Sequence, residues 1–260
     1  MPSVSDGPLD RILEHEAGDL TCTVEAELHL SSLQEALAPH GQMLALDPPG
    51  DPTIGACLAA NLSGPRRHRY GTMRDLVIGV TVVLPDGTVA NAGGKVVKNV
   101  AGYDLGKLFC GSEGRLGRIV RVSVRLHPLP EAKATAVAPA DPERALALLG
   151  STLVPSAFDL HWPDRLALLF EGSERAVAAQ VKAFGGQQAG DEVWAEAAER
   201  QRAARGRLSF APGRLVEVLG GLEQAVVRVS AGVAYVPHEV SDPRDPIEIA
   251  LVERIAAAFA

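Results

Sequence analysis

Short runs of alternating apolar and polar residues make up the first 130 residues, with glycine or proline at most of the joints between them. The alternation over Asp19–Leu28 predicts a half-buried strand. The next apolar run begins at Ser31, has Gln34 three residues later and ends at Gly41, which predicts a capped helix of about three turns. Short strands and helices in succession predict an α/β or α+β domain.

A proline-rich segment interrupts this pattern. The strand predicted at Gln42–Leu46 runs into Asp47–Pro52, which cannot continue a ladder because prolines donate no hydrogen bond. We therefore expect a rigid loop there. With Asp51 as its N-cap and Pro52 at its first position, a helix of small residues is predicted over Thr53–Leu62.

Two longer strands follow. The apolar run Leu76–Leu84 turns at Pro85-Asp86-Gly87 into Thr88–Asn91, which predicts a hairpin at the centre of the sheet. After a predicted helix at Tyr103–Phe109, alternation over Arg118–Leu126 predicts another strand. This strand ends at Pro128-Leu129-Pro130, where we place the domain boundary. The predicted domains are therefore residues 1–130 and 131–260.

The second half has a different pattern. Strands are predicted at 132–138, 158–162, 166–170, 214–219 and 224–236, and helices at 141–149, 173–184, 191–205 and 246–260. Its first five elements, in the order strand, helix, strand, strand, helix, are typical of ferredoxin-like packing.

Composition narrows the functional classes. The 260 residues are 47% hydrophobic and carry 25 Lys and Arg against 32 Asp and Glu, a net charge of -7. This balance excludes a disordered chain and gives no overall attraction to nucleic acid or an anionic membrane. Cys22, Cys57 and Cys110 lie far apart, which favours buried thiols in a reducing compartment over a zinc or disulfide framework. The acidic N-terminal stretch and the lack of a long apolar run predict a cytoplasmic chain without a membrane span.

Two glycine-containing segments are candidates for chemistry. One is the helix start Thr53-Ile54-Gly55-Ala56, and the other is Gly111-Ser112-Glu113-Gly114-Arg115-Leu116-Gly117. Glycine at a helix start lets a backbone approach an anionic ligand closely. Neither segment has the spacing of a Rossmann fold or a P-loop. Taken alone, each segment is equally well explained by tight packing of a helix on the sheet.

Four motifs, in order over about Asp19–Pro130, resemble the FAD-binding domain of the vanillyl-alcohol oxidase family, also called PCMH-type. They are P-T-I-G through A-A-N-L-S-G-P-R-R at 52–67, G-T-M-R-D-L-V-I-G-V at 71–80, G-K-V-V-K-N-V-A-G-Y-D-L at 94–105 and G-S-E-G-R-L-G at 111–117. Within the family, S-G-P-R-R and K-N-V-A-G-Y-D-L are most similar to the E subunits of bacterial glycolate oxidases. The implied fold is α+β: a PCMH-type domain with a mixed or antiparallel sheet flanked by helices, followed by a ferredoxin-like cap.

The resemblance implies non-covalently bound FAD and a set of residues along it. The implied cofactor-binding residues are Thr53, Ile54, Gly55, Asn61, Ser63, Gly64, Gly71, Thr72, Asp75, Gly114, Gly117 and Ile119. Bare backbone at the glycines would let main-chain N–H groups reach the cofactor. No metal site is expected.

The sequence departs from the family pattern in two places. Family members open with a small subdomain whose G-G-x-S loop wraps the diphosphate, and nothing before Asp19 resembles it. The family's Asn-Pro-Gly ending is also absent. We therefore expect the first subdomain to be missing and the FAD site to be partly built.

The sequence does not identify catalytic residues. His161 and His238 are the histidines of the second half, and a lone histidine is more often a packing or surface residue than a base. Arg66, Arg67 and Arg69 could bind a carboxylate or phosphates, or form a solvated or subunit-docking loop.

Three further residues have open or structural interpretations. Lys98 and Tyr103 lie in a motif that is near the flavin in relatives, although Tyr103 could equally belong to the core. We expect Cys57 to be a small buried hydrophobic residue.

Two hypotheses follow from the resemblance. In the first, the chain is the FAD-binding subunit of a glycolate oxidase complex that oxidises glycolate or a related 2-hydroxy acid. Its partners would be a catalytic flavoprotein subunit and an iron–sulfur subunit that takes the electrons, and the complex could hold it at the inner membrane. In the second, the chain is an assembly subunit of the same complex that has lost FAD.

Overall fold

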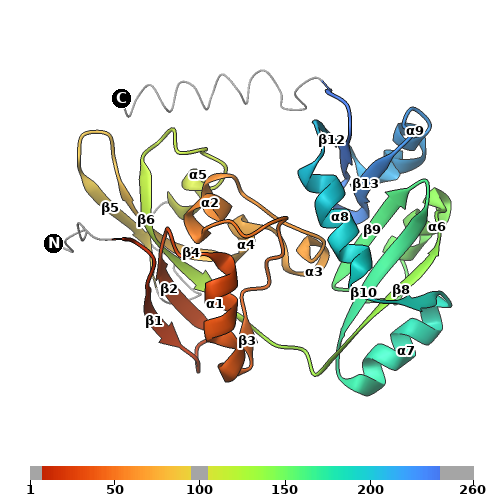
Figure 1. The fold of residues 1–260 in the computed structure, drawn as a ribbon, viewed down its shortest axis with the longest axis horizontal. Coiled ribbons are helices and arrows are strands. Elements are labelled where there is room, and N and C mark those ends of the chain that lie inside the picture. Colours follow the sequence, from red (N-terminus) through yellow and green to blue (C-terminus); the bar gives the residue numbers. More distant parts are fainter. Residues whose placement is uncertain (1–7, 95–104, 241–260) are drawn as a thin grey trace. The chain divides into compact units, whose positions relative to one another are not determined.

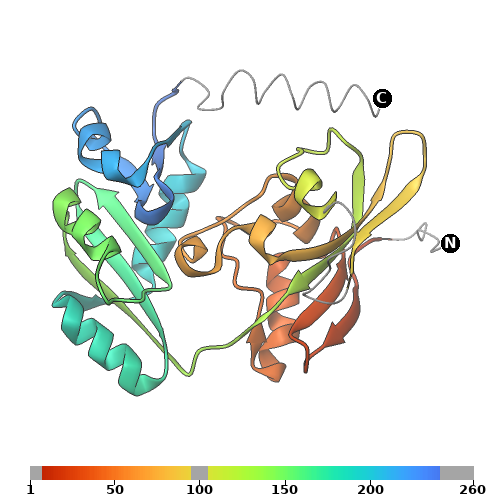
Figure 2. The ribbon, with the colours of Figure 1, turned by 180° about the vertical axis from the view of Figure 1, so that it is seen from behind.

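The computed structural model describes residues 8–94 and 105–240. These residues form two compact units (Figures 1 and 2). Among the described residues, the first unit contains 8–63, 71–94 and 105–129, and the second contains Gly64–Tyr70 and 130–240. The chain passes into the second unit after Leu129. The earlier stretch Gly64–Tyr70 also belongs to the second unit, and a prediction with one domain boundary does not include it there.

An antiparallel five-stranded sheet forms the first unit (Figure 1). Its order is β1 (Ile12–Glu16), β2 (Thr21–Glu25), β6 (Arg118–Arg125), β4 (Val77–Val83) and β5 (Val89–Gly93). The strands predicted from alternation at β2 and β6 and from the apolar run at β4 are confirmed. The predicted position of the hairpin was wrong, because β5 lies at the sheet edge and β6 takes the centre.

Helices cover this sheet and complete its core. They are α1 (Leu30–Leu37), α2 (Ile54–Ala59), α4 (Met73–Leu76) and α5 (Leu105–Phe109), and a 3-10 turn, η1 (Ala38–His40), follows α1. A two-stranded ladder joins β3 (Gln42–Met43) to β7 (His127–Pro128). Leu33, Leu37, Ile54, Leu58 and Met73 are fully buried in one cluster with the sheet.

Two predicted helix caps were wrong. Helix α1 begins after His29, and the Ser31 amide and hydroxyl both donate to the Asp51 carboxylate at 2.9 and 2.8 Å. Asp51 is thus used by α1 and not by α2. The N-cap of α2 is Thr53, whose Oγ1 accepts a hydrogen bond from the Ala56 amide at 3.2 Å.

A seven-stranded antiparallel sheet forms the second unit. Its order is β11 (Gln187–Ala189), β8 (Ala132–Pro139), β10 (Arg165–Gly172), β9 (Ala157–Trp162), β13 (Ala225–Arg228), β14 (Val233–Val236) and β12 (Gly206–Ser209). With α6 (Pro142–Leu149) and α7 (Glu174–Phe184), strands β8 to β11 follow the ferredoxin-like succession βαββαβ. The predicted α+β class is confirmed.

The end of the second unit differs from the prediction. The segment 214–219 is not a strand, because Leu215 and Leu219, four residues apart, are the buried positions of helix α9 (Leu215–Leu219). The single strand predicted at 224–236 is split into β13 and β14 by the 3-10 turn η3 (Val229–Ala231) and by Gly232, which has a φ of 57°. The predicted charged helix is α8 (Glu192–Arg202). The helix predicted at 246–260 lies outside the described residues.

The two faces of this sheet differ in chemistry. Phe158, Leu160 and Phe170 belong to the buried apolar cluster that α7 and α9 complete. The alternating positions of β9 carry Asp159 and His161, both fully buried. Within residues 8–94 and 105–240, no helix combines the length and the apolar character needed to cross a bilayer.

Candidate functional site

Backbone hydrogen bonds bring the two glycine-containing segments together in the first unit. The Gly111 amide donates to the Leu58 carbonyl at 3.1 Å, and the Glu113 amide donates to the Ala59 carbonyl at 2.9 Å. Glu113 adopts a φ of 53°, which is uncommon for a residue other than glycine. The loop after α5 is therefore held against the end of α2.

The start of α2 is held just as closely against the sheet. The Gly55 amide donates to the Ala26 carbonyl at 2.7 Å. A Cβ atom at Gly55 would lie 2.8 Å from the Cβ of Ala26 and 2.9 Å from its carbonyl oxygen. Close packing explains Gly55 without a ligand, as the sequence allowed.

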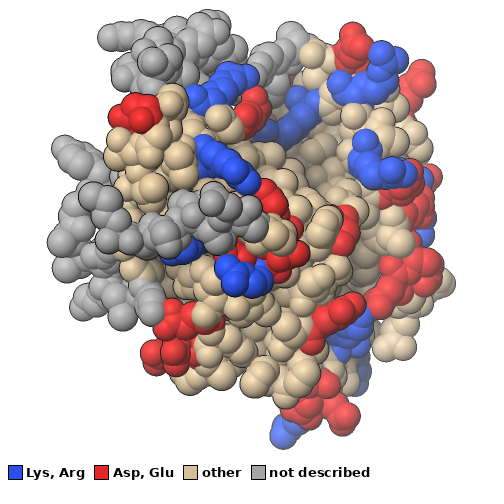
Figure 3. All heavy atoms as spheres, turned by 60° about the vertical axis from the view of Figure 1, so that its left-hand side comes forward, with Lys and Arg blue, Asp and Glu red and all other residues tan. Residues whose placement is uncertain are grey.

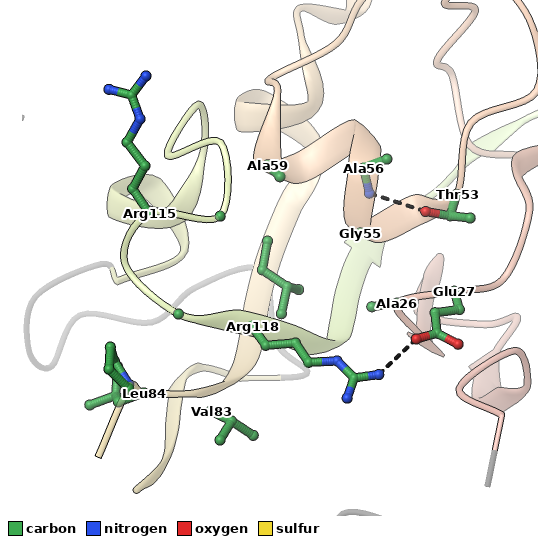
Figure 4. A pocket seen from close by; sticks show the side chains of 14 residues that line it. Ala26, Glu27, Thr53, Gly55, Ala56, Ala59, Val83, Leu84, Arg115 and Arg118 are labelled. Atoms are coloured by element: carbon green, nitrogen blue, oxygen red, sulfur yellow. Dashed lines mark hydrogen bonds and ion pairs between the residues drawn. The ribbon is translucent and has the colours of Figure 1, made fainter. Parts of the chain in front are cut away.

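A groove of about 620 Å³ lies between these elements (Figure 4). Three segments form most of its wall: the start of α2, the turn after β4 and the loop that leads into β6. Its lining residues are Ala26, Glu27, Thr53, Gly55, Ala56, Ala59, Val83, Leu84, Pro85, Gly114, Arg115, Gly117, Arg118 and Ile119. This volume is in the usual range for small-molecule and cofactor sites.

Five of the twelve predicted cofactor-binding residues line this groove. They are Thr53, Gly55, Gly114, Gly117 and Ile119. They come from two segments more than fifty residues apart in the chain, and the fold places both at one cavity.

The other seven predicted residues have different surroundings. Ile54 is fully buried in the core, and the Asn61 side chain accepts a hydrogen bond from the Arg74 amide at 3.0 Å. Thr72 and Asp75 cap α4, where the Thr72 amide donates to the Asp75 carboxylate at 2.8 Å.

The remaining three are small residues. Gly71 has a φ of 82° and adjoins the Asp75 side chain. Ser63 is buried, and Gly64 is grouped with the second unit. None of these seven residues lines the groove.

Whether a flavin cofactor fits this groove depends on how much open space lies along its wall. Gly114 has a φ of 76°, and a Cβ atom there would meet no other atom within 4 Å. Ala56 and Ala59 present only methyl groups along the exposed side of α2 (Figure 4). The wall is thus open backbone and small side chains, which suits a flat ring and its linked chain.

Charged side chains at the groove are paired with opposite charges. Arg118 donates through Nη2 to the Glu27 carboxylate at 2.8 Å, and Arg115 donates to the Glu113 carboxylate at the same distance. On the face drawn in Figure 3, acidic and basic side chains of the described residues are interspersed. No extended basic surface is visible among them, in keeping with the net charge of -7.

The basic segment of the sequence lies in the second unit, within the stretch Gly64–Tyr70, which we call the strap. The strap includes the short helix α3 (Arg67–Tyr70). Arg66 pairs with the Glu171 carboxylate at 2.6 Å, and the Glu171 side chain is only 1% exposed. His68 Nδ1 lies 2.8 Å from the Ser230 hydroxyl.

The other arginines of the strap are also engaged. Arg69 donates to the Glu171 carbonyl at 3.4 Å. The pKa of Arg67 lies below its usual range, mainly because the side chain is partly buried, although Tyr235 acts in the opposite direction. The strap arginines thus have partners in their own chain.

The other candidate residues are placed as follows. His161 is fully buried, with its ring 6.5 Å from that of Trp194, and His238 is exposed. Cys57 is fully buried, as expected, and burial raises the pKa of its thiol to about 12, with a smaller contribution from the Asp51 charge. Lys98 and Tyr103 lie outside the described residues.

Several groove residues were not predicted from the sequence. Ala26 and Glu27 follow β2, and Val83, Leu84 and Pro85 follow the course of β4 into its turn. No local pattern marks them, because only the pairing of β2 and β4 with β6 brings them to the cavity. Arg115 and Arg118 directly follow the predicted residues Gly114 and Gly117, and this position is the sequence signal that could have identified them as groove residues.

Comparison with known proteins gives a family match and several similar proteins. Residues 3–93 match the family described as FAD binding domain. Glycolate oxidase subunit GlcE of Escherichia coli is 31% identical over 196 residues, which are 73% of this chain and 56% of that protein. The mitochondrial cytochrome-type D-lactate dehydrogenase 1 of Saccharomyces cerevisiae is 37% identical over 59% of this chain and 26% of that protein.

Solved structures show the same fold. A structure of alkyldihydroxyacetonephosphate synthase has a TM-score of 0.67 and 17% identity, and covers 96% of this chain and 63% of that one. At this identity the likeness concerns the fold alone. The chain spans between about a quarter and just over half of the length of the two curated relatives above.

Proposed function

We propose that the chain belongs to the family of flavoproteins that share this FAD-binding domain and that FAD binds non-covalently in the groove beside α2. The match of residues 3–93 to the FAD binding domain and the likeness to GlcE support the resemblance seen in the sequence. The observation that carries the proposal is the groove itself. Two segments expected along a flavin, around Gly55 and around Gly114, meet there and leave about 620 Å³ open.

Each groove residue has a role that follows from its chemistry. Open backbone at Gly114 would let main-chain groups approach the cofactor, and Thr53 would keep the start of α2 in place through its cap. Ala56 and Ala59 would leave room along the helix. When bound, FAD supplies the acceptor for the two electrons that a 2-hydroxy acid loses on oxidation to a 2-oxo acid.

The predicted residues outside the groove remain part of the proposal with a supporting role. Asn61, Thr72 and Asp75 fix the backbone that follows α2 through their hydrogen bonds. We propose that this rigid segment keeps the wall of the groove in a geometry ready for the cofactor.

The substrate class and the partners are inferred from the relatives. Those relatives are named as glycolate oxidase subunits and D-lactate dehydrogenases, which supports a small 2-hydroxy acid as the substrate. We propose that the chain is a subunit of such an oxidase, assembled with a catalytic flavoprotein subunit and an iron–sulfur subunit. We propose that the chain works in the cytoplasm and contacts the inner membrane only through the other subunits of this complex.

The test is the absorption spectrum of the protein purified alone and with the co-expressed partner subunits. We expect flavin bands, released as FAD on denaturation, and bleaching of these bands when glycolate or D-lactate is added without oxygen. Bands that never bleach with any 2-hydroxy acid would contradict the substrate class.

The assembly hypothesis predicts the opposite spectrum. A protein that joins the complex yet stays colourless, and takes up no added FAD, would overturn the flavoprotein proposal. It would support a docking subunit instead.

A further inference from the structure

Few charged groups face the groove. Of its fourteen lining residues, Glu27, Arg115 and Arg118 are the ones that carry a charge. The Thr53 hydroxyl already accepts the capping hydrogen bond from Ala56. The remaining lining residues are glycine or apolar, so an anionic part of a ligand depends on the two arginines and on backbone amides.

The two arginines differ in direction. In Figure 4, Arg115 extends away from Ala56 and Ala59, whereas Arg118 extends from the strand below α2 toward Glu27. Arg118 begins β6, directly after Gly117, which has a φ of 148° and passes close to the Val83 carbonyl. The position of Arg118 is therefore fixed by the strand, and its guanidinium is the one that lies along the groove.

The ion pair between Arg118 and Glu27 is weak enough for a ligand to replace Glu27. Their side chains are 65% and 52% exposed, and exposed ion pairs contribute little to stability. The contact uses one guanidinium nitrogen, Nη2, and within the described residues the other nitrogens of Arg118 have no recorded partner. A ligand oxygen can therefore replace Glu27 or bind beside it at small cost.

We propose that Arg118 is the diphosphate-binding side chain of this groove and that Glu27 competes with the ligand for it. An arginine fork matches phosphate oxygens in a bidentate, charge-assisted geometry. FAD carries a diphosphate between its riboflavin and its adenosine. This inference rests on the proposed function and adds to it the residue that selects the dinucleotide over riboflavin.

The proposal predicts effects of opposite sign for the two members of one ion pair. Arg118→Gln removes the phosphate partner and raises the dissociation constant for FAD about tenfold or more. Glu27→Gln releases Arg118 and removes a repelling charge, so it lowers that constant severalfold. If the pair only holds β2 to β6, both substitutions act in the same direction.

The experiment is a titration of flavin-free protein with FAD and, separately, with riboflavin, followed by flavin fluorescence. Arg214→Gln is the matched control, because it removes the same charge from a similarly exposed ion pair at a residue that does not line the groove. We expect Arg118→Gln to weaken FAD but not riboflavin, Glu27→Gln to strengthen FAD, and Arg214→Gln to change FAD affinity less than threefold. Melting curves confirm that each variant folds.

The outcomes separate this inference from the proposed function. If wild-type protein binds FAD but Arg118→Gln leaves the affinity unchanged, or weakens riboflavin equally, the phosphate role of Arg118 is wrong and the groove proposal stands. The same holds if Arg214→Gln acts as strongly as Arg118→Gln, since the effect is then one of overall charge. If wild-type protein binds no FAD, the proposed function itself fails.

Discussion

Individual residues near the groove are explained either by packing or by ligand binding, and Gly55 is explained by packing. Its place at the groove suggested a ligand, yet its missing side chain is already required by the approach of α2 to Ala26. Ala56, one residue on, is exposed and faces the groove. Neighbouring positions on one helix thus separate packing from binding.

We expect Gly55→Ala to lower the free energy of unfolding of the first unit by roughly 1–3 kcal/mol, because the added methyl group overlaps the backbone at Ala26. Gly18→Ala is the matched control, since a Cβ atom there meets nothing within 4 Å and φ is not positive. This control should change stability by less than about 1 kcal/mol. Urea denaturation measures both, and equal stability of the two variants would refute the close-packing argument.

A single histidine gives the second unit an expected pH dependence. Partial burial lowers the pKa of His68 below its usual value, and the nearby Asp159 charge only partly opposes this. The unfolded chain, with a pKa near 6.5, therefore binds a proton more readily. The contribution of neutral His68 to the free energy of unfolding is fully present above the unfolded-state pKa. It is lost as the pH falls through the lowered pKa of the folded state.

The pH prediction is measured as melting temperature between pH 8 and pH 5. The His68→Gln variant should lose less melting temperature on acidification than wild type does. The exposed His238→Gln serves as the control for loss of an imidazole. Parallel pH curves for wild type and His68→Gln would show that His68 makes no such contribution.

Among the elements, the strap best shows what a sequence leaves open. Its three arginines suggested a solvated loop, a docking surface or an anion site, and the structure gives them partners in the second unit. Glu171 lies 105 residues further along the chain, so no local pattern could reveal that it pairs with Arg66. Its burial, at 1% side-chain exposure, makes the pair structural.

Removing Arg66 alone should therefore be costly. We expect Arg66→Met to lower the free energy of unfolding of the second unit by about 3 kcal/mol, because it leaves a buried carboxylate without its partner. The double variant Arg66→Met with Glu171→Leu should recover most of that loss. In the exposed pair of Arg214 and Glu217, Arg214→Met should cost under about 1 kcal/mol.

Guanidinium denaturation followed at Trp162 and Trp194, both in the second unit, measures these differences. Equal effects of Arg66→Met and Arg214→Met would contradict a buried role for the strap pair. A double variant less stable than Arg66→Met would show that the Glu171 carboxylate is favourable even without Arg66.

How far elements could be predicted depends on whether their signal is local. Strands β2 and β6 and helix α7 follow directly from the period of their apolar residues, and β4 follows from its continuous apolar run. The segment 214–219 was misassigned because its short apolar run suits either structure, and only the burial of Leu215 and Leu219 against the core decides for α9. The caps of α1 and α2 were missed for a related reason, since Asp51 acts across the chain on Ser31.

At the scale of the whole molecule, two units with separate apolar cores share one covalent chain. The chain leaves the first unit after Ser63, forms the strap in the second and returns at Gly71. The family motifs predicted the two halves of the groove, but the sheet pairing that adds Ala26 and Val83 to its wall is visible only in the folded chain. Bound FAD should stabilise the first unit by about 2.7 kcal/mol at a hundred times its dissociation constant.

The most direct test of the account is a calorimetric titration of FAD into flavin-free wild-type protein and two leucine variants. Ala56→Leu places a larger side chain in the groove from an exposed position, and Ala60→Leu places it on an exposed position nearby that does not line the groove. We predict one FAD per chain for wild type and Ala60→Leu, and at least a tenfold loss of affinity for a folded Ala56→Leu. Unchanged binding by Ala56→Leu, or none by wild type, would contradict the central claim that this groove holds the flavin.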